Sequence, residues 1–320
     1  MPTNIIRLFQ IVKAKILGRK LALCDEGDCD GIISATLFKM KYPKSEIVLA
    51  FPAEVKRSII LNFPEWYFVA DLPCPKHAII RADHHKTNPP KAKIEYYDPN
   101  APCSAILALK ALGLNGNSEA VKLVKIAVET DTGNFNTYEA KILTAAIKGS
   151  SYIGKLRIVN SLAKHGVKAI RSSIIQSPAR KYLEVMRETE KLAKSLPLRE
   201  ILILVFKRRY KLSYRYLCIL AERKGAKFTC CIVPKGLFSI RVYLGASRGS
   251  YDCSKIALKL GGGGHPYAAG AIVKSFRRHT AINKILETIV LNLGLKELEY
   301  YEISYSNGKF NLERRSLKLE

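Results

Sequence analysis

The sequence predicts an α/β protein with an N-terminal, mostly parallel sheet and flanking helices, joined by a helical connector to a smaller C-terminal α/β domain. Two observations lead to this prediction. Short apolar segments alternate with helix-like segments over residues 1–150, and a chain of 320 residues is long for a single hydrophobic core. We therefore expect a first domain over 1–150, a basic helical connector over 151–196, and a second domain with a C-terminal tail over 197–320.

Five apolar segments of the first domain have the length and composition of strands. They lie at residues 20–26, 46–51, 66–71, 78–82 and 94–97, and helical patterns cover 31–41, 103–112, 118–130 and 138–149. Strands that alternate with helices form parallel sheets covered on both faces. Because such sheets bind ligands at the carboxyl ends of their strands, we expect the functional residues of this domain there.

The rest of the chain predicts a second α/β unit. Residues 151–196 are helical and basic in pattern and end at Leu196-Pro197. Strands are expected at 200–207, 228–233 and 239–244, a helix at 281–293, and a hairpin over 299–312 around Asn307-Gly308. A glycine run at 261–264 precedes a strand that begins with small residues at 268–271.

Composition narrows the class of protein. The apolar spacing from Ile5 to Leu17 predicts an amphipathic helix rather than a signal peptide, and no apolar run is long enough for a membrane span. We expect a cytoplasmic protein with no membrane partner. The eight cysteines include no Cys-x-x-Cys pair, which argues against a zinc ribbon or a redox dithiol. We interpret all eight as small, buried apolar residues.

The positive charge of the chain is concentrated in its second half. Residues 1–150 hold 20 Lys and Arg against 15 Asp and Glu, whereas 151–320 hold 33 against 12, within a net charge of +26. An acidic centre beside a basic surface suits a metal site that faces a polyanion such as single-stranded nucleic acid. A basic surface without a specific partner is the alternative.

The segment Asp28-Cys29-Asp30-Gly31 follows the first predicted strand. Two carboxylates at i and i+2 can point at one cation, and the glycine allows the chain to turn tightly. The alternative is a turn in which an aspartate caps the next helix.

The segment Asp83-His84-His85 follows another apolar strand. Imidazole is a good ligand for first-row metals, and carboxylates suit Mn²⁺ and Mg²⁺. The alternative is a solvated loop with a helix-capping aspartate. Asp71 and Asp131 also end predicted elements, so the acids and histidines of this domain all fall at loop positions of one α/β unit.

These residues resemble a known family. The ordered set is similar to the four motifs of the DHH phosphoesterases: Asp28-x-Asp30-Gly31, Asp71, Asp83-His84-His85 and Asp131-Thr132-Gly133. Gly262-Gly263-Gly264-His265, with Ala268-Ala269-Gly270 after it, resembles the signature of the DHH-associated domain of RecJ exonucleases and nano-RNases. The resemblance covers residues 18–275.

The resemblance implies a centre that holds two Mn²⁺ ions, with Mg²⁺ as the alternative. By motif position its ligands are Asp28, Asp30, Asp71 as the bridging carboxylate, His84 and Asp131. Glu26 stands where many members have a histidine, two residues before Asp28, and we include it as a ligand for a hard cation. His85 resembles the contact to the substrate phosphate, and Asp83 would orient the two histidines.

The second domain is expected to bind the rest of the substrate. Glycines 262–264 can present N–H groups to a phosphate, and His265 could donate to a phosphate oxygen. The alternative for the glycine run is a flexible turn. Arg248 resembles the family's phosphate-binding arginine. Arg241 is a weaker candidate, because an arginine on a strand is more often a surface residue.

The resemblance implies an enzyme, a Mn²⁺-dependent hydrolase that cuts phosphodiester bonds in single-stranded nucleic acid or short oligonucleotides, as exonucleases do. Two alternatives remain open: a small-nucleotide enzyme acting on 3′-phosphoadenosine 5′-phosphate or a cyclic dinucleotide, and a non-catalytic replication scaffold. The sequence leaves open DNA or RNA preference, digestion polarity, substrate length and a homodimeric state.

Overall fold

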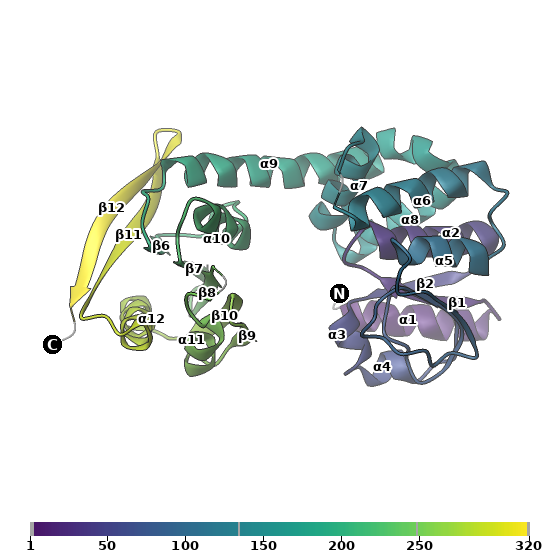
Figure 1. Cartoon of the computed structure of the whole chain (residues 1–320), viewed down its shortest axis with the longest axis horizontal. Coiled ribbons are helices and arrows are strands. Elements are labelled where there is room, and N and C mark those ends of the chain that lie inside the picture. The colour runs from purple at the N-terminus through teal and green to yellow at the C-terminus, as the bar shows by residue number, and fades with distance from the viewer. Residues whose placement is uncertain (1–2, 134, 248, 319–320) are drawn as a thin grey trace. The chain divides into compact units, whose positions relative to one another are not determined.

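The computed structural model describes residues 3–133, 135–247 and 249–318, and the contacts between residues divide the chain into two units between Leu183 and Glu184 (Figure 1). The division falls inside one continuous helix, α9 (Ser173–Ser195). Helix α8 (Tyr152–His165) packs against α2 (Cys29–Lys41) in the first unit and contributes Ile158 and Leu162 to its core. Residues 151–183 therefore belong to the first unit, whereas we expected them in a separate connector.

The first unit contains a five-stranded sheet in which all strands are parallel. In spatial order the strands are β2 (Glu46–Ala50), β1 (Leu21–Asp25), β3 (Trp66–Ala70), β4 (Ala78–Asp83) and β5 (Ile94–Tyr97). The chain moves outward from β1 to β2, then returns to the other side of β1 to form β3. At such a reversal point the loops after the two central strands separate and leave a ligand-binding crevice.

Helices cover both faces of this sheet (Figure 1). One face packs against α2, α5 (Ser104–Ala111), α6 (Ser118–Asp131), α7 (Tyr138–Gly149), α8 and the 3-10 helix Gly166–Arg171. The other face packs against α1 (Thr3–Ile16) and the short helices α3 (Pro52–Val55) and α4 (Ile59–Asn62), through residues such as Ile11, Val55 and Leu61. Helix α2 is buried from Cys29 to Phe38, because it lies between the sheet and α5, α6 and α8.

The second unit contains a mixed seven-stranded sheet. In spatial order its strands are β12 (Lys309–Lys318), β11 (Glu297–Ser306), β6 (Ile201–Phe206), β7 (Phe228–Gly236), β8 (Ser239–Ala246), β10 (Ala268–Lys274) and β9 (Gly263–His265). Helix α10 (Tyr214–Arg223) and the end of α9 cover one face, and α11 (Cys253–Lys259) and α12 (Arg278–Leu293) cover the other. Both units are α/β, which confirms the predicted fold class.

Several local expectations agree with the structure. Asn307 and Gly308 join β11 to β12 with φ angles of 51° and 75°, the left-handed backbone that a two-residue hairpin turn requires. All eight cysteines are free, and all except Cys74 are buried. None of the helices in the described ranges is both long and apolar enough to cross a membrane.

Candidate metal centre

Acidic and histidine side chains gather where β1, β3 and β4 of the first unit end. Asp25 is the last residue of β1, Asp71 follows β3, and Asp83 is the last residue of β4. Because these strands are adjacent and parallel, their carboxyl ends lie at one edge of the sheet. The reversal in strand order between β1 and β3 therefore brings the motifs into one place.

Helix α2 begins at this edge and carries two of the carboxylates. Asp28 caps the helix, since its Oδ1 accepts hydrogen bonds from the N–H groups of Asp30 at 3.0 Å and Gly31 at 3.3 Å. Gly31 is required by close packing, because a Cβ atom there would overlap the carbonyl oxygen of Asp25. The aspartate of this motif thus acts as a helix cap and still leaves its exposed side chain at the site.

Asp30 is held by the start of another helix. Its two oxygens accept hydrogen bonds from the N–H groups of Ser104 and Ala105, each at 2.7 Å, at the N-terminus of α5. Only 1% of Asp30 is exposed, and this burial raises its pKa to about 7 although the two N–H groups favour the charged form. The carboxylate is fixed in place but carries an uncompensated charge when it ionises.

Asp71 has an unusual backbone conformation. Its φ angle is 59°, in a region that non-glycine residues rarely adopt, and such strain tends to occur at functional sites. The side chain is 3% exposed, and its Oδ1 accepts a hydrogen bond from Ser104 Oγ at 3.0 Å. Burial, together with the nearby charges of Asp30 and Asp28, raises the pKa of Asp71 well above its usual value.

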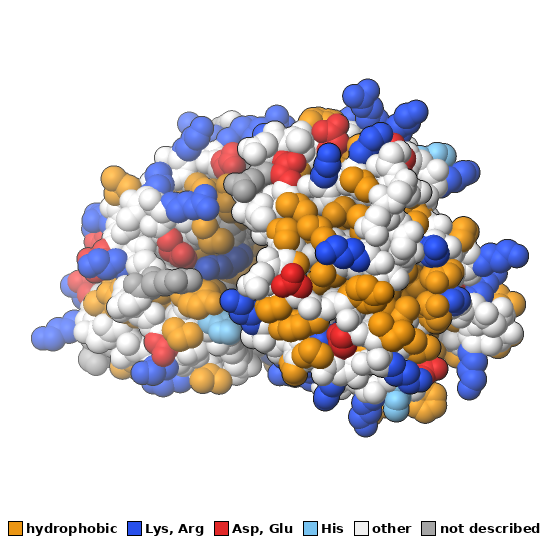
Figure 2. Space-filling model, turned by 45° about the vertical axis from the view of Figure 1, so that its right-hand side comes forward, with side chains coloured by type: hydrophobic (Ala, Val, Ile, Leu, Met, Phe, Trp, Pro, Cys, Tyr) orange, Lys and Arg blue, Asp and Glu red, His pale blue; other side chains and the backbone are white. Residues whose placement is uncertain are grey.

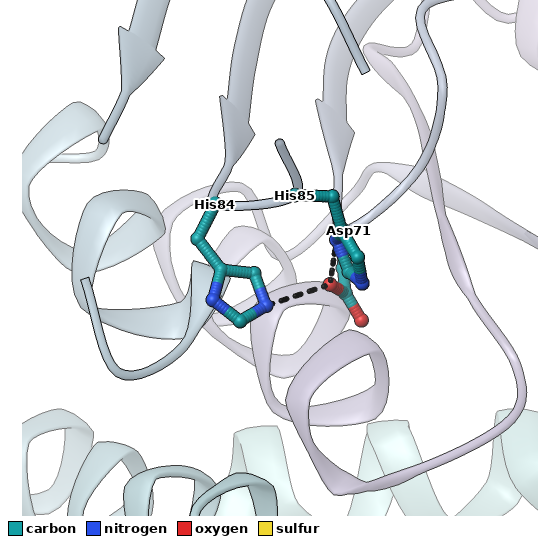
Figure 3. Close-up of side chains that lie close together, drawn as sticks. All are labelled: Asp71, His84 and His85. Atoms are coloured by element: carbon teal, nitrogen blue, oxygen red, sulfur yellow. Dashed lines mark ion pairs between the residues drawn. The ribbon is translucent and has the colours of Figure 1, made fainter. Parts of the chain in front are cut away.

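His84 points one ring nitrogen at three carboxylates, of which Figure 3 shows Asp71. Its Nδ1 lies 3.0 Å from the carbonyl oxygen of Ala101, which accepts a hydrogen bond from Nδ1–H and so leaves the ring lone pair on Nε2. Nε2 lies 3.9 Å from Asp30 Oδ2, 3.9 Å from Asp71 Oδ1 and 3.6 Å from Asp131 Oδ2. A carbonyl that fixes the tautomer in this way is typical of metal-ligating histidines.

His85 is held by Asp83, which is in turn held by buried groups. His85 Nδ1 lies 2.9 Å from Asp83 Oδ1 and 3.4 Å from Asp71 Oδ1, and the bond to Asp83 raises the pKa of His85. Asp83 Oδ2 accepts hydrogen bonds from Arg81 and Asn88, each at 2.9 Å. The side chain of His85 is 46% exposed, so it can contact a ligand outside the protein.

Arg81 was not predicted from the sequence, and it organises this edge of the sheet. It is fully buried, and besides Asp83 it donates to the carboxylate of Glu95 and to the carbonyl oxygens of Leu72, Asn88 and Pro89. A buried arginine with this many acceptors fixes the loop that carries the two histidines.

The side chains form three overlapping groups. Within each group, the ligand atoms lie within 4.8 Å of one another. The groups are Asp71, His84 and His85; Asp30, His84 and Asp131; and Asp25, Asp28 and Asp71. Asp71 and His84 each belong to two groups. Carboxylate and imidazole donors in overlapping sets suit neighbouring divalent cations of the Mn²⁺ or Mg²⁺ type.

Asp25 was missed in the sequence, and its environment supports a cation site. Its Oδ1 is buried and has no hydrogen-bond partner among the described residues. Burial and the nearby Asp28 charge raise the pKa of Asp25 to about 7. The sequence signal that could have identified Asp25 is its position near the end of the first predicted strand, directly before Glu26, which we chose instead.

Glu26, which we expected to be a metal ligand, lies outside these groups. Its carboxylate contacts Arg7 Nη2 at 3.3 Å and Lys155 Nζ at 3.5 Å. Since the two sides of an extended chain alternate, Asp25 and Glu26 point in different directions. The cluster contains Asp25 and not Glu26, so we propose Asp25 as the ligand in place of Glu26.

The expected substrate residues of the second unit surround β9. The N–H groups of Gly261 and Gly262 donate to the carbonyl oxygens of Leu258 and Ala257, so they cap α11. A Cβ atom at Gly262 would overlap the carbonyl oxygen of Gly270, which explains the glycine by close packing on β10.

The last two glycines of the run, Gly263 and Gly264, pair with β10 in the edge strand β9. His265 is exposed and stacks on Tyr267, with ring centroids 5.5 Å apart. Arg248 lies outside the described residues.

Comparison with known proteins identifies one relative by sequence. No protein-family profile matches the chain. A stretch of 229 residues is 26% identical to the bifunctional oligoribonuclease and PAP phosphatase NrnA of Thermus thermophilus. This match covers 66% of the chain and 63% of the relative, so the chain spans less than two thirds of the relative's length.

Solved structures share the fold over most of the chain. The pGpG-specific phosphodiesterase PggH from Vibrio cholerae has a TM-score of 0.61 at 16% identity, covering 86% of this chain and 99% of that one. An exonuclease RecJ bound to manganese has a TM-score of 0.58 at 12% identity, covering 92% and 95%. At these identities the likeness is one of fold.

Proposed function

We propose that this chain is a metal-dependent phosphodiesterase of the DHH type that acts on single-stranded nucleic acid or short oligonucleotides. The order of its motifs, its fold and its similarity to NrnA support the proposal. The observation that carries the proposal is the convergence of the motif residues into overlapping groups of ligand atoms at the carboxyl edge of one sheet. A scaffold that had lost catalysis would have no need for this set, so the scaffold alternative is not favoured.

The residues that would hold two divalent cations are Asp25, Asp28, Asp30, Asp71, His84 and Asp131. When bound, such ions neutralise the phosphodiester, supply a hydroxide at neutral pH and stabilise the leaving oxygen. Asp71 belongs to two of the groups, and its two carboxylate oxygens suit a residue shared by neighbouring ions, whereas His84 has one free ring nitrogen and would bind one ion. Mn²⁺ is our first choice because the set includes an imidazole, and the similar RecJ structure contains manganese.

His85 is our candidate for the contact to the substrate phosphate. Asp83 Oδ1 accepts a hydrogen bond from His85 Nδ1, and Arg81 and Asn88 donate hydrogen bonds to Asp83 Oδ2. This chain of contacts fixes the imidazole ring and leaves Nε2 for a ligand. We regard Asp83 as a positioning residue that acts through His85.

A small-nucleotide substrate is the second candidate, supported by the names of two similar proteins. NrnA is named as both an oligoribonuclease and a PAP phosphatase, and PggH as a phosphodiesterase for pGpG. These names favour short substrates over long ones. The basic second half favours a longer anion, and Lys and Arg outnumber Asp and Glu on the surface in Figure 2.

One experiment tests both candidates. The metal-stripped protein is incubated with end-labelled DNA and RNA oligomers of graded length, and with 3′-phosphoadenosine 5′-phosphate, with added Mn²⁺, added Mg²⁺ or chelator. We expect hydrolysis only with metal. Full hydrolysis in chelator would contradict the metal-dependent mechanism. Hydrolysis of the mononucleotide but of no oligomer would show that the substrate is a small nucleotide and not an oligonucleotide.

A further inference from the structure

The second unit contains a small basic cavity away from the glycine run. The cavity has a volume of about 110 Å³ and is lined by Arg209, Val233, Pro234, Lys235, Arg241 and Tyr243. Three of these side chains are cations, and no carboxylate lines the cavity. A concave surface that holds three like charges attracts an anion.

Arg241 lies partly buried at this cavity without a polar partner. Its Nε atom is buried and makes no hydrogen bond among the described residues. Its guanidinium carbon lies 5.5 Å from the ring centroid of Tyr243, which is itself stacked on Tyr214. A guanidinium that lies near an aromatic ring and lacks an acceptor is ready to bind a planar or tetrahedral oxyanion through two N–H groups.

The backbone places Lys235 at the same cavity by means of an irregular strand. Strands β7 and β8 pair as Pro234 with Ile240 and Gly236 with Ser239, and the register shifts between Pro234 and Gly236. Lys235 therefore lies at a bulge, where a side chain turns out of the regular alternation. Proline has no N–H group to pair, which suits this break.

Several cations elsewhere in this unit have acidic partners, whereas the three cations of the cavity have none among the described residues. Lys207 lies 3.8 Å from both Glu302 and Glu313, and Arg215 lies 3.3 Å from Glu222. Within the described part of the chain, no such ion pair involves Arg209, Lys235 or Arg241. The positive charge of the cavity is thus not balanced by the described residues of the protein.

The cavity and the glycine run are two different places on the sheet. On β8, Arg241 pairs with Ile272, whereas Gly245 pairs with Ala268, which is also the partner of His265. The four residues from Arg241 to Gly245 span roughly 13 Å of strand.

We propose that this cavity binds one phosphate group of a single-stranded nucleic acid, as a second contact beyond the residues expected to hold the cleaved end. The nucleic-acid source rests on the function proposed above, whereas the phosphate chemistry rests on the cavity itself. Arg241 supplies the bidentate donor, and Arg209 and Lys235 supply exposed charge at the rim. A dinucleotide is too short to need this contact, so the cavity should matter only for longer strands.

The test compares three single-charge variants in chelator, where no hydrolysis is needed. Arg241→Gln and Lys235→Gln change the cavity, and Arg223→Gln removes one exposed charge from the end of α10 as the matched control. Lys235 is exposed, so its variant tests the cavity even if Arg241→Gln reduces folding. Binding of a labelled dinucleotide and a labelled long oligomer is measured over a salt series.

We expect both cavity variants to bind the long oligomer about tenfold more weakly, because each loses a charge-assisted hydrogen bond. The negative slope of log K against log salt should become shallower by about 0.7, the value for one phosphate of a single strand. Dinucleotide binding and the Arg223→Gln control should match the wild type. Unchanged slopes in both cavity variants, or an equal loss in the control, would overturn the proposal.

Competition by inorganic phosphate distinguishes two ligands of the cavity, a phosphate group of a nucleic-acid strand and free phosphate. If strands occupy the cavity, millimolar phosphate should compete with the long oligomer in the wild type and not in Arg241→Gln. Phosphate binding that depends on Arg241, without any effect of Arg241 on strand binding, would overturn the nucleic-acid source. Because these readouts need no hydrolysis, they hold or fail separately from the proposed enzymatic activity.

Discussion

Replacing Asp25 and replacing Glu26 should have opposite effects, although the two acids are neighbours in the sequence. Glu26 is buried and contacts two cations, Arg7 and Lys155. Glu26→Gln removes the charge that these cations face, and breaking a buried ion pair costs about 3–5 kcal/mol. Arg7 keeps its contact with Glu54 at 2.8 Å, so we expect the lower end of that range, about 3 kcal/mol.

Asp25→Asn should instead stabilise the metal-free protein. Burial raises the pKa of Asp25 from 3.8 to about 7, so the folded state binds a proton more tightly than the unfolded state. The free energy of unfolding that this group contributes is therefore lost as pH rises from about 4 to 7. A shift of about three pKa units corresponds to a loss of about 4 kcal/mol at pH 8. A neutral asparagine removes that loss at pH 8 and should change little near pH 4.

The assay is urea unfolding in chelator at pH 8 and near pH 4, together with elemental analysis of the metal-loaded proteins. We expect Glu26→Gln to be less stable but to keep its metals, and Asp25→Asn to be more stable at pH 8 but to bind metal more weakly. If Glu26→Gln lost a metal while Asp25→Asn kept a full complement, the assignment of the two residues would be reversed. If Asp25→Asn were destabilised equally at both pH values, the pKa argument would be refuted.

Three further predictions concern the histidines and the buried arginine. His84→Ala should lose both metal and activity, whereas the exposed His77→Ala should keep both in elemental analysis and turnover assays; equal metal content in the two variants would contradict the role of His84. His85→Ala should keep its metals and lose turnover, so a wild-type rate would remove it from the substrate contact. Arg81→Met should cost about 3–5 kcal/mol in urea unfolding, because it leaves Asp83 and Glu95 buried or partly buried without their cation; a loss below about 1 kcal/mol would show that those carboxylates find other partners.

Much of the first unit could be predicted from sequence because its signals are local. Alternating apolar segments gave strands β1 to β5 to within two residues at either end, and the motif acids fall at strand and helix ends, as expected. Helix α10 was missed because aromatic and polar residues from Tyr214 to Arg223 hide its apolar stripe. That stripe appears only when Leu217, Cys218 and Ala221 pack against the sheet.

Tertiary contacts explain what the sequence could not give at the site. Asp25 and Glu26 have similar chemistry and adjacent positions, and the placement of Arg7 on α1 and Lys155 on α8 decides which one is neutralised by the protein. The same holds for Arg81, whose five acceptor residues come from segments between Leu72 and Glu95. Sequence patterns identify which residues can ligate a cation, but not which charges are already paired.

In the first unit, buried charges that have a partner of opposite charge differ in role from buried charges that have none. Buried Arg81 and Glu26 each have partners of opposite charge, so they stabilise the fold without any ligand. Asp25, Asp30 and Asp71 are also buried, and burial raises the pKa of each, because no lysine or arginine of the described chain pairs with them. A cluster of this kind makes the metal-free fold less stable at neutral pH. Divalent cations would remove that cost, so metal should stabilise the protein more at pH 8 than at pH 5, and the same charges that oppose folding would determine metal affinity.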